Sequence, residues 1–224
     1  MTGPTVGFLH TADVHVATFD ALVAAHDPGA RARHAVVPDL LADARRVATD
    51  TADLARRTLA ALTGLVDQGA DVVVCTCSTL GPLVERLADR VRVPVLRVDR
   101  PVAREAVACG PVVGVVAALA STVGPTRDLL DDEASRSGGR EVVAVVVPGA
   151  WDAFEAGDTD GYERRVEAAA RGLAPGVDVV VLAQASMAGA ADRLRDLGVP
   201  VLTSPGPAVR AALTAAAGRS PAAR

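Results

Sequence analysis

The chain has 224 residues, of which 50% are hydrophobic, 22% are charged and 2% are aromatic, and its mean hydropathy is +0.29. This composition is typical of a folded globular protein with one ordinary domain or two small ones. The net charge of −4 and the lack of a basic block exclude nucleic acid as an expected partner, because phosphate binding needs clustered cationic side chains. All 23 basic residues are arginine, which excludes Schiff-base chemistry and a Walker lysine.

The sequence predicts a protein of the reducing cytoplasm. Its first residues lack the basic region and the long apolar run of a signal peptide. No apolar stretch reaches the roughly 18 residues that a membrane span needs, so no membrane is expected as a partner. Cys75, Cys77 and Cys109 do not make a disulfide framework. No Gly-x-Gly-x-x-Gly follows a predicted strand, and no cofactor is expected.

Short, valine-rich apolar runs alternate with helical patterns along the chain. In chain order the runs predict β-strands at residues 6–9, 34–37, 71–76, 94–98, 112–117, 141–147, 178–183 and 200–203. They are largely continuous, as expected for strands covered on both faces in a parallel sheet. Between them, residues 53–66 carry leucines and a valine at helical spacing. The alternation predicts an α/β fold.

The two halves of the sequence resemble each other. The segment 71–80 matches 178–187, and Val93-Pro-Val-Leu matches Val199-Pro-Val-Leu after a one-residue gap. The offset of the first pair is 178 − 71 = 107, and it also aligns Val6-Gly7 with Val113-Gly114. Such a repeat indicates two similar structural units. We expect two pseudo-symmetric parallel-sheet lobes with helices on both faces and a cleft between them. Lobe 1 would comprise residues 1–104 with 205–224, and lobe 2 residues 105–204.

Polar residues follow several predicted strands at their carboxyl ends, where parallel sheets bind ligands. They are His10, Thr11, Asp13 and His15 after the first strand, Cys77, Ser78 and Thr79 after the third, Ser121 and Thr122 after the fifth, and Gln184 and Ser186, with Ala185 between them, after the seventh. The repeat pairs Cys77 with Gln184, and Thr79 with Ser186. The expected ligand site is therefore symmetric in shape and asymmetric in chemistry.

These residues resemble the cofactor-independent aspartate/glutamate/hydantoin racemase superfamily, which includes maleate isomerases and arylmalonate decarboxylases. The first strand-end motif is Cys77-Ser78-Thr79, where the amino-acid racemases have Cys-Asn-Thr. The second is Leu182-Ala-Gln-Ala-Ser-Met187, where hydantoin racemases have Leu-Gly-Cys-Ala-Gly-Met. The segment Gly114–Thr122 is similar to a family stretch that ends in substrate-contacting hydroxyls. The resemblance covers most of the chain and implies a small carboxylate substrate; dimers are common in the family, so it also allows a homodimer.

The sequence departs from the two-thiol racemases at the second cysteine. Gln184 occupies that position, and an amide cannot exchange a proton at useful pH. Cys75 lies deeper in a strand, and Cys109 precedes a strand and so lies at the wrong end of the sheet. A single thiolate, Cys77, is therefore expected to act on the α-carbon or the double bond of a small acid, as a racemase, isomerase or decarboxylase would (EC class 5.1.1 or 4.1.1).

The resemblance and the strand-end positions together suggest a role for each candidate. Cys77 sits before a predicted helix, whose amide groups favour a thiolate. His10 or His15 is the expected second proton-transfer group. The expected substrate-binding residues are Thr11, Asp13, Ser78, Thr79, Ser121, Thr122, Gln184, Ala185 and Ser186, through hydroxyl, amide and backbone donors.

Other functions stay open at this point. A non-catalytic protein that binds a small acid would also explain Gln184. A hydrolase with Cys77 as nucleophile would need His10 or His15 within hydrogen-bond reach. The segment from His10 to His15 also resembles the first motif of metallophosphoesterases, but the chain has four histidines and no asparagine to complete that site. No metal is predicted.

Overall fold

The computed structural model describes residues 3–47, 51–135 and 139–218. Within these ranges the chain forms eight β-strands: β1 (Thr5–His10), β2 (Arg31–Val36), β3 (Val72–Cys75), β4 (Val95–Arg97), β5 (Val112–Ala117), β6 (Glu141–Val146), β7 (Val179–Leu182) and β8 (Val201–Thr203). They form two four-stranded sheets, ordered β2-β1-β3-β4 and β6-β5-β7-β8, and all neighbouring strands are parallel. The predicted α/β fold with two parallel sheets is confirmed.

The chain divides into two compact units. Unit 1 contains residues 1–98 and 205–224, and unit 2 contains residues 99–204; residues 219–224, which were assigned to lobe 1 from the sequence, lie outside the described residues. The predicted boundary after residue 104 falls inside α5 (Arg100–Cys109), whereas the structural boundary places that helix wholly in unit 2.

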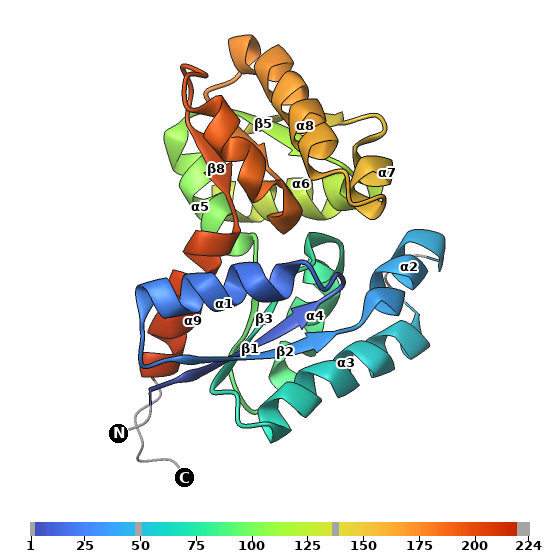
Figure 1. Cartoon of the computed structure of the whole chain (residues 1–224), viewed down its shortest axis with the longest axis vertical. Coiled ribbons are helices and arrows are strands. Elements are labelled where there is room, and N and C mark those ends of the chain that lie inside the picture. Colours follow the sequence, from blue (N-terminus) through green and yellow to red (C-terminus); the bar gives the residue numbers. More distant parts are fainter. Residues whose placement is uncertain (1–2, 48–50, 136–138, 219–224) are drawn as a thin grey trace. The chain divides into compact units, whose positions relative to one another are not determined.

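Unit 1 has helices on both faces of its sheet (Figure 1). They are α1 (His15–His26), α2 (Pro38–Val47), α3 (Ala52–Asp67), α4 (Gly81–Leu87) and α9 (Pro205–Ala217), with the 3₁₀ turns η1 (Ser78–Leu80) and η2 (Ala88–Arg90). Helices α1 and α9 pack together over β1, β2 and β3, on the face to which Phe8 and His10 point, and α3 and α4 pack against the strands on the other face. Of the apolar positions predicted at helical spacing in α3, Leu54 and Leu62 are buried, and Leu59 and Val66 are half-buried; Leu65 is buried in addition.

Unit 2 repeats this arrangement. Its helices are α5, α6 (Ala120–Ala134), α7 (Ala150–Glu155) and α8 (Thr159–Leu173), with the 3₁₀ segments η3 (Ala174–Gly176) and η4 (Ala185–Leu194). Helices α5 and α6 form one apolar core with Val113, Val115 and Ala117. Helix α8 and η4 form the other with Val116 and Leu182. Alternate residues of β5 thus enter opposite cores, as the pleat of a strand requires.

Two helices each follow a strand of one unit and pack in the other unit. Helix α5 follows β4 of unit 1 but packs against α6 and β7, and α9 follows β8 of unit 2 but packs against α1, β1 and β3. Each unit therefore obtains one core helix from the chain segment that leaves the other.

The internal repeat also appears in individual hydrogen bonds. The Asp71 carboxylate accepts from Thr5 N–H at 2.9 Å, and the Asp178 carboxylate accepts from Val112 N–H at 2.8 Å. Both pairs differ by the offset of 107, since 71 + 107 = 178 and 5 + 107 = 112. The same side chain thus fixes the start of the same strand pair in each unit.

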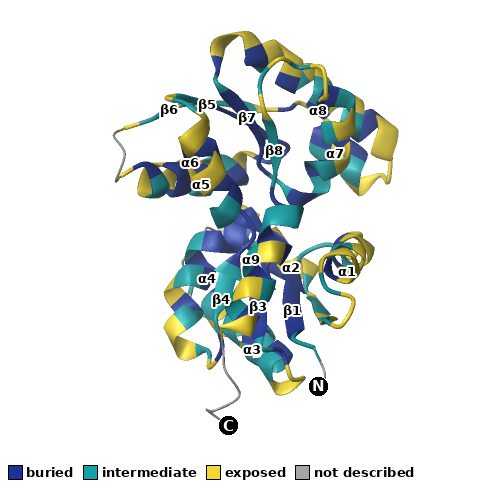
Figure 2. Ribbon diagram, turned by 90° about the vertical axis from the view of Figure 1, so that its left-hand side faces the viewer, coloured by how far each residue is buried: buried dark blue, intermediate teal, exposed yellow. Residues whose placement is uncertain are grey.

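The strand that differs most from its prediction is β2. It begins at Arg31, three residues before the predicted strand 34–37, and each of its residues is exposed or half-buried because it lies at an edge of its sheet. A search for continuous apolar runs misses such an edge strand. By contrast β3 and β7 are buried at every residue, and they are dark blue in Figure 2 where the ribbon is visible. None of the described helices is long and apolar enough to cross a membrane.

Candidate active site

The predicted nucleophile lies where the chain leaves β3. Cys77 follows the strand end by two residues, in an extended conformation, and directly precedes η1. Its carbonyl oxygen accepts from Leu80 N–H at 3.1 Å, which turns the chain toward α4. Cys77 is 8% exposed, and Ser78 and Thr79 are also buried. The carboxyl end of β3 thus carries a thiol and two hydroxyls.

The other two cysteines occupy different environments. Cys75 is the last residue of β3 and is fully buried, with its Sγ 3.8 Å from the carbonyl oxygen of Cys77. Cys109 is the last residue of α5 and is exposed, and its Sγ donates to the carbonyl oxygen of Glu105 at 3.4 Å. Desolvation and the nearby Glu105 carboxylate raise the pKa of Cys109.

A buried arginine supports the segment after Cys77. Arg97, at the end of β4, is 4% exposed and donates to Glu85 of α4 at 3.1 Å. Its guanidinium group lies against Gly81, where an added Cβ would come within 2.6 Å of Cζ. Sequence reasoning missed Arg97, because a single charged residue at a strand end gives no signal of burial.

This packing predicts opposite effects on stability when two different glycines are replaced by alanine. We expect Gly81→Ala to lower the free energy of unfolding by about 1–3 kcal/mol, because the new methyl group must displace a buried, ion-paired guanidinium. In Gly64→Ala the methyl group meets nothing within 4 Å on α3, and helix propensity predicts a gain of about 0.5–1 kcal/mol. Urea unfolding followed by circular dichroism measures both. Equal effects of the two substitutions would contradict this role of Arg97.

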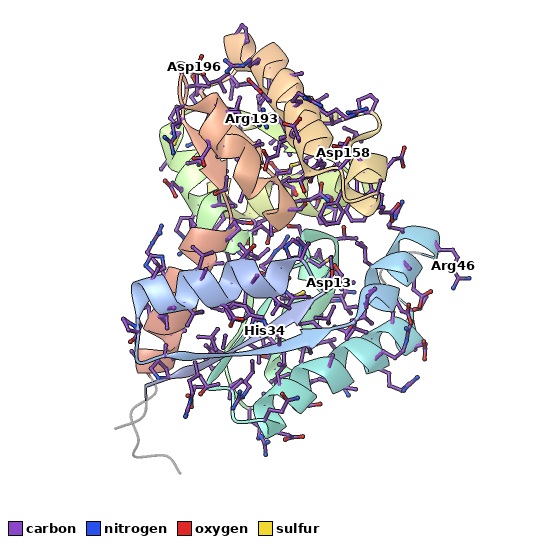
Figure 3. The ribbon with its side chains drawn as sticks, viewed as in Figure 1. Asp13, His34, Arg46, Asp158, Arg193 and Asp196 are labelled. Carbon is purple, nitrogen blue, oxygen red and sulfur yellow. The ribbon has the colours of Figure 1, made fainter. Side chains whose placement is uncertain are left out.

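Three side chains link the end of β1 to the surface of unit 1. His10 is fully buried; its Nδ1 lies 2.8 Å from Thr76 Oγ1 and its Nε2 lies 2.9 Å from His34 Nδ1. His34 Nε2 lies 3.1 Å from a carboxylate oxygen of Asp20. Figure 3 labels His34, on β2 and beside α1. Burial, with smaller contributions from His15 and His34, lowers the pKa of His10 to about 3, so His10 is neutral at pH 7.

The second predicted histidine has a different setting. His15 is the first residue of α1 and is 9% exposed, with its ring centroid 5.9 Å from that of His10. Burial lowers the pKa of His15 to about 4, against a smaller opposing effect of Asp13. Thr11 is half-buried and Asp13 is exposed, both in the turn before α1. His15 is thus a neutral imidazole near the end of β1.

The equivalent strand end in unit 2 has no thiol. Gln184 follows β7, and its Oε1 accepts from Ala118 N–H at 2.6 Å. With its oxygen held by the backbone, the amide nitrogen of Gln184 is left as the donor. Ser186 Oγ lies 2.8 Å from the hydroxyl of Tyr162. Burial raises the pKa of Tyr162 to about 12, although the bond to Ser186 acts in the opposite direction.

The remaining predicted binding residues lie at helix starts of unit 2. Ala185 is buried at the start of η4. Ser121 is half-buried in the first turn of α6. Thr122 is 1% exposed, and its N–H donates to the carbonyl oxygen of Leu119 at 3.1 Å. The hydroxyl of Thr126 donates to the Thr122 carbonyl at 2.8 Å.

Within unit 1 the structure brings His10 and His15 together and joins His10 to the residue before Cys77. It adds His34 and Asp20, which sequence reasoning did not select. The register of β2 with β1 places His34 on the same face of the sheet as Phe8 and His10, and the sequence alone does not give this register. Among the described residues no group of three or more His, Cys, Asp or Glu side chains could hold a metal ion.

The fold and these strand ends define an α/β protein with two parallel-sheet units and a thiol at the carboxyl end of a strand in one of them. The family model for Asp/Glu/hydantoin racemases matches residues 11–212, and the chain belongs to this family. None of the curated proteins matches it significantly.

Solved structures with the same fold include three types of enzyme. The aspartate racemase of Picrophilus torridus is 15% identical, with a TM-score of 0.74 over 96% of this chain and 95% of that one. The allantoin racemase of Klebsiella pneumoniae is 19% identical, with a TM-score of 0.67 over 96% and 88%. An arylmalonate decarboxylase is 19% identical, with a TM-score of 0.59 over 97% and 94%. At these identities the likeness shows the fold alone.

Proposed function

We propose that the protein is a cofactor-independent enzyme that acts at the α-carbon or a double bond of a small carboxylic acid, with Cys77 as its single thiolate. The observation that carries the proposal is the placement of Cys77, two residues after the end of β3 and followed by two hydroxyl residues. Membership of the racemase family supports an enzyme of the racemase or decarboxylase type.

The histidine contacts favour different roles for His10 and His15. Both ring nitrogens of His10 have hydrogen-bond partners inside unit 1, so His10 is proposed as a positioning residue. The His15 ring makes aromatic contacts with His10 and Phe19 but no hydrogen bond among the described residues. A neutral imidazole with an available nitrogen can accept or deliver a proton. His15 is therefore the proposed proton-transfer group.

The proposed chemistry follows from having one thiol. Cys77 can take up an α-proton as the thiolate or protonate a carbanion on one face as the thiol. As the thiolate it can also add to an unsaturated acid and be expelled after bond rotation. Ser78 and Thr79 are the proposed hydrogen-bond donors to the substrate carboxylate or the developing enolate. In unit 2, the oxygen of Gln184 is anchored by Ala118 N–H, which leaves its amide nitrogen as a hydrogen-bond donor.

The anchored amide of Gln184 also favours a second candidate, a protein that binds a small acid without turnover. An amide donor replaces a proton-exchanging thiol at this position. A binding protein needs only such donors, and its Cys77 would behave as an ordinary buried thiol. The state of Cys77 therefore distinguishes the two candidates.

The test is the pH dependence of alkylation by iodoacetamide, followed by mass spectrometry at each cysteine. For an enzyme we expect Cys77 to react well below pH 8.5, the range of an ordinary thiol. Cys109 is the internal reference, because it is exposed and its pKa is raised. If Cys77 reacts only in the alkaline range of Cys109, the thiolate proposal fails and the binding protein is favoured.

A further inference from the structure

The hydrogen-bonded series Asp20–His34–His10–Thr76 runs from solvent to the buried end of β3. The side chain of Asp20 is 56% exposed and that of His34 is 14% exposed, whereas His10 and Thr76 are buried. The two imidazole rings are stacked, with centroids 5.1 Å apart and planes at 15°. Phe8 stacks on His34 with centroids 5.5 Å apart. The rings are thus held in positions where the direction of each hydrogen bond is determined by its neighbours.

The donors can first be assigned with His34 neutral. A carboxylate only accepts hydrogen bonds, so His34 Nε2 carries the proton that faces Asp20. Nδ1 of neutral His34 is then an acceptor, and His10 must donate to it from Nε2. Neutral His10 has no proton left on Nδ1, which therefore accepts from the hydroxyl of Thr76. In this state His10 is the Nε2–H tautomer.

One proton added to His34 reverses the direction of the hydrogen bonds between His34 and His10 and between His10 and Thr76. Nδ1 of the imidazolium donates, so His10 Nε2 becomes the acceptor. His10 then carries its proton on Nδ1 and donates to Thr76 Oγ1. The Thr76 hydroxyl turns to another acceptor within reach, the carbonyl oxygen of Leu9, 3.2 Å away. The charge stays on His34 beside Asp20, since burial keeps His10 neutral.

We propose that Asp20 and His34 are positioning residues that act on Thr76 through His10, as a proton-driven tautomer switch. One proton from solvent, taken up by His34, converts His10 from the Nε2–H to the Nδ1–H tautomer and turns the Thr76 hydroxyl from His10 to Leu9. Thr76 is the residue between β3 and Cys77, so the switch links an exposed ion pair to the backbone beside the proposed nucleophile.

Among the described residues, few charged or titratable side chains face His34. From α1 it faces Asp20, whereas His15 of the same helix contacts His10. From β1 it faces His10. Arg31 and Arg33 of its own strand alternate to the other face of the sheet. Helix α9, which covers β1 and β3 on the same face, contributes Arg210 as its one charged residue, and that side chain is exposed. Asp20 is thus the anion that stabilises a charged His34.

The experiment is a titration of the full ¹⁵N-labelled chain, from pH 8.5 to 5.5, followed by long-range ¹H–¹⁵N spectra of the imidazoles. We expect the His10 signals to change from those of an Nε2–H to those of an Nδ1–H tautomer, with the same midpoint as the protonation of His34. In His34→Gln the His10 signals should no longer depend on pH. In Asp20→Asn, which removes the carboxylate partner of His34, the change of His10 tautomer should no longer occur at the midpoint of the parent.

His26→Gln is the matched control, because His26 is exposed at the end of α1 and outside the series; both midpoints should be unchanged. The switch is overturned if His10 keeps one tautomer while His34 titrates, if the two midpoints differ, or if His34 does not titrate in this range. The titration does not rest on the proposed function and should be the same in Cys77→Ala. An ordinary Cys77 thiol would therefore overturn the enzyme proposal and leave the switch intact.

Discussion

Replacement of Cys77 by alanine should lower the activity on the true substrate by about 100- to 10,000-fold. This is the range that a positioned acid–base group contributes to a rate. The measurement is the exchange of α-protons in D₂O, followed by NMR over a panel of chiral α-substituted acids. With one thiol we expect deuterium to enter from one face, so that the product keeps a single configuration. Loss of the thiol should stop this exchange while the fold remains.

Cys109→Ala is the matched control for this prediction, because it removes a thiol at an exposed helix end and should leave exchange unchanged. Full exchange in Cys77→Ala would contradict the assignment of Cys77. Exchange that scrambles the configuration would show that a second base acts, and His15 would be the first residue to replace. A panel without any exchange, combined with an ordinary alkylation profile of Cys77, would favour the binding protein.

The buried strands could be predicted from the sequence because their physical signal is local. In β3 and β7 each side chain enters an apolar core, so the valine runs at residues 71–76 and 178–183 mark them directly. The repeat of 107 residues located the equivalent strands in the two units in advance. The edge strand β2 was found only in its second half, because Arg31 and Arg33 reach solvent and interrupt the apolar run.

The contacts of the site residues could be predicted less well. Cys77, Ser78 and Thr79 follow a strand with a strong signal, and their position at its end was predictable. The burial of Arg97 depends on Gly81 and Glu85, which lie in a different element. The contact between His10 and His34 depends on the register of β1 with β2. Such pairs become visible only when strand order and register are known, so Asp20, His34 and Arg97 were missed.

Acidification from pH 7 to pH 5 should lower the free energy of unfolding by about 4 kcal/mol through His10 and His15 alone. In the unfolded chain both imidazoles take up a proton near pH 6.5, whereas in the folded chain they do so only at about 3 and about 4. Unfolding therefore takes up two protons in this window, and stability falls as the pH falls. Each imidazole contributes about 1.4 kcal/mol for each pH unit below 6.5, or about 2 kcal/mol at pH 5.

The variant that isolates this effect is His15→Phe, which keeps an aromatic ring against Phe19 and removes one of the two protonation sites. Its loss of stability between pH 7 and pH 5 should be about half that of the parent, about 2 kcal/mol. His26→Gln, at an exposed position, should behave like the parent. Urea unfolding at each pH, followed by circular dichroism and by Trp151 fluorescence, gives these values for the chain as a whole and for unit 2. Since His10 and His15 lie in unit 1 and Trp151 lies in unit 2, comparison of the two probes shows whether the two units unfold together. Equal stability at pH 7 and pH 5 would show that the imidazoles at the end of β1 take up protons in the folded chain as readily as in the unfolded chain. A neutral His15 in the proposed site would then have no basis.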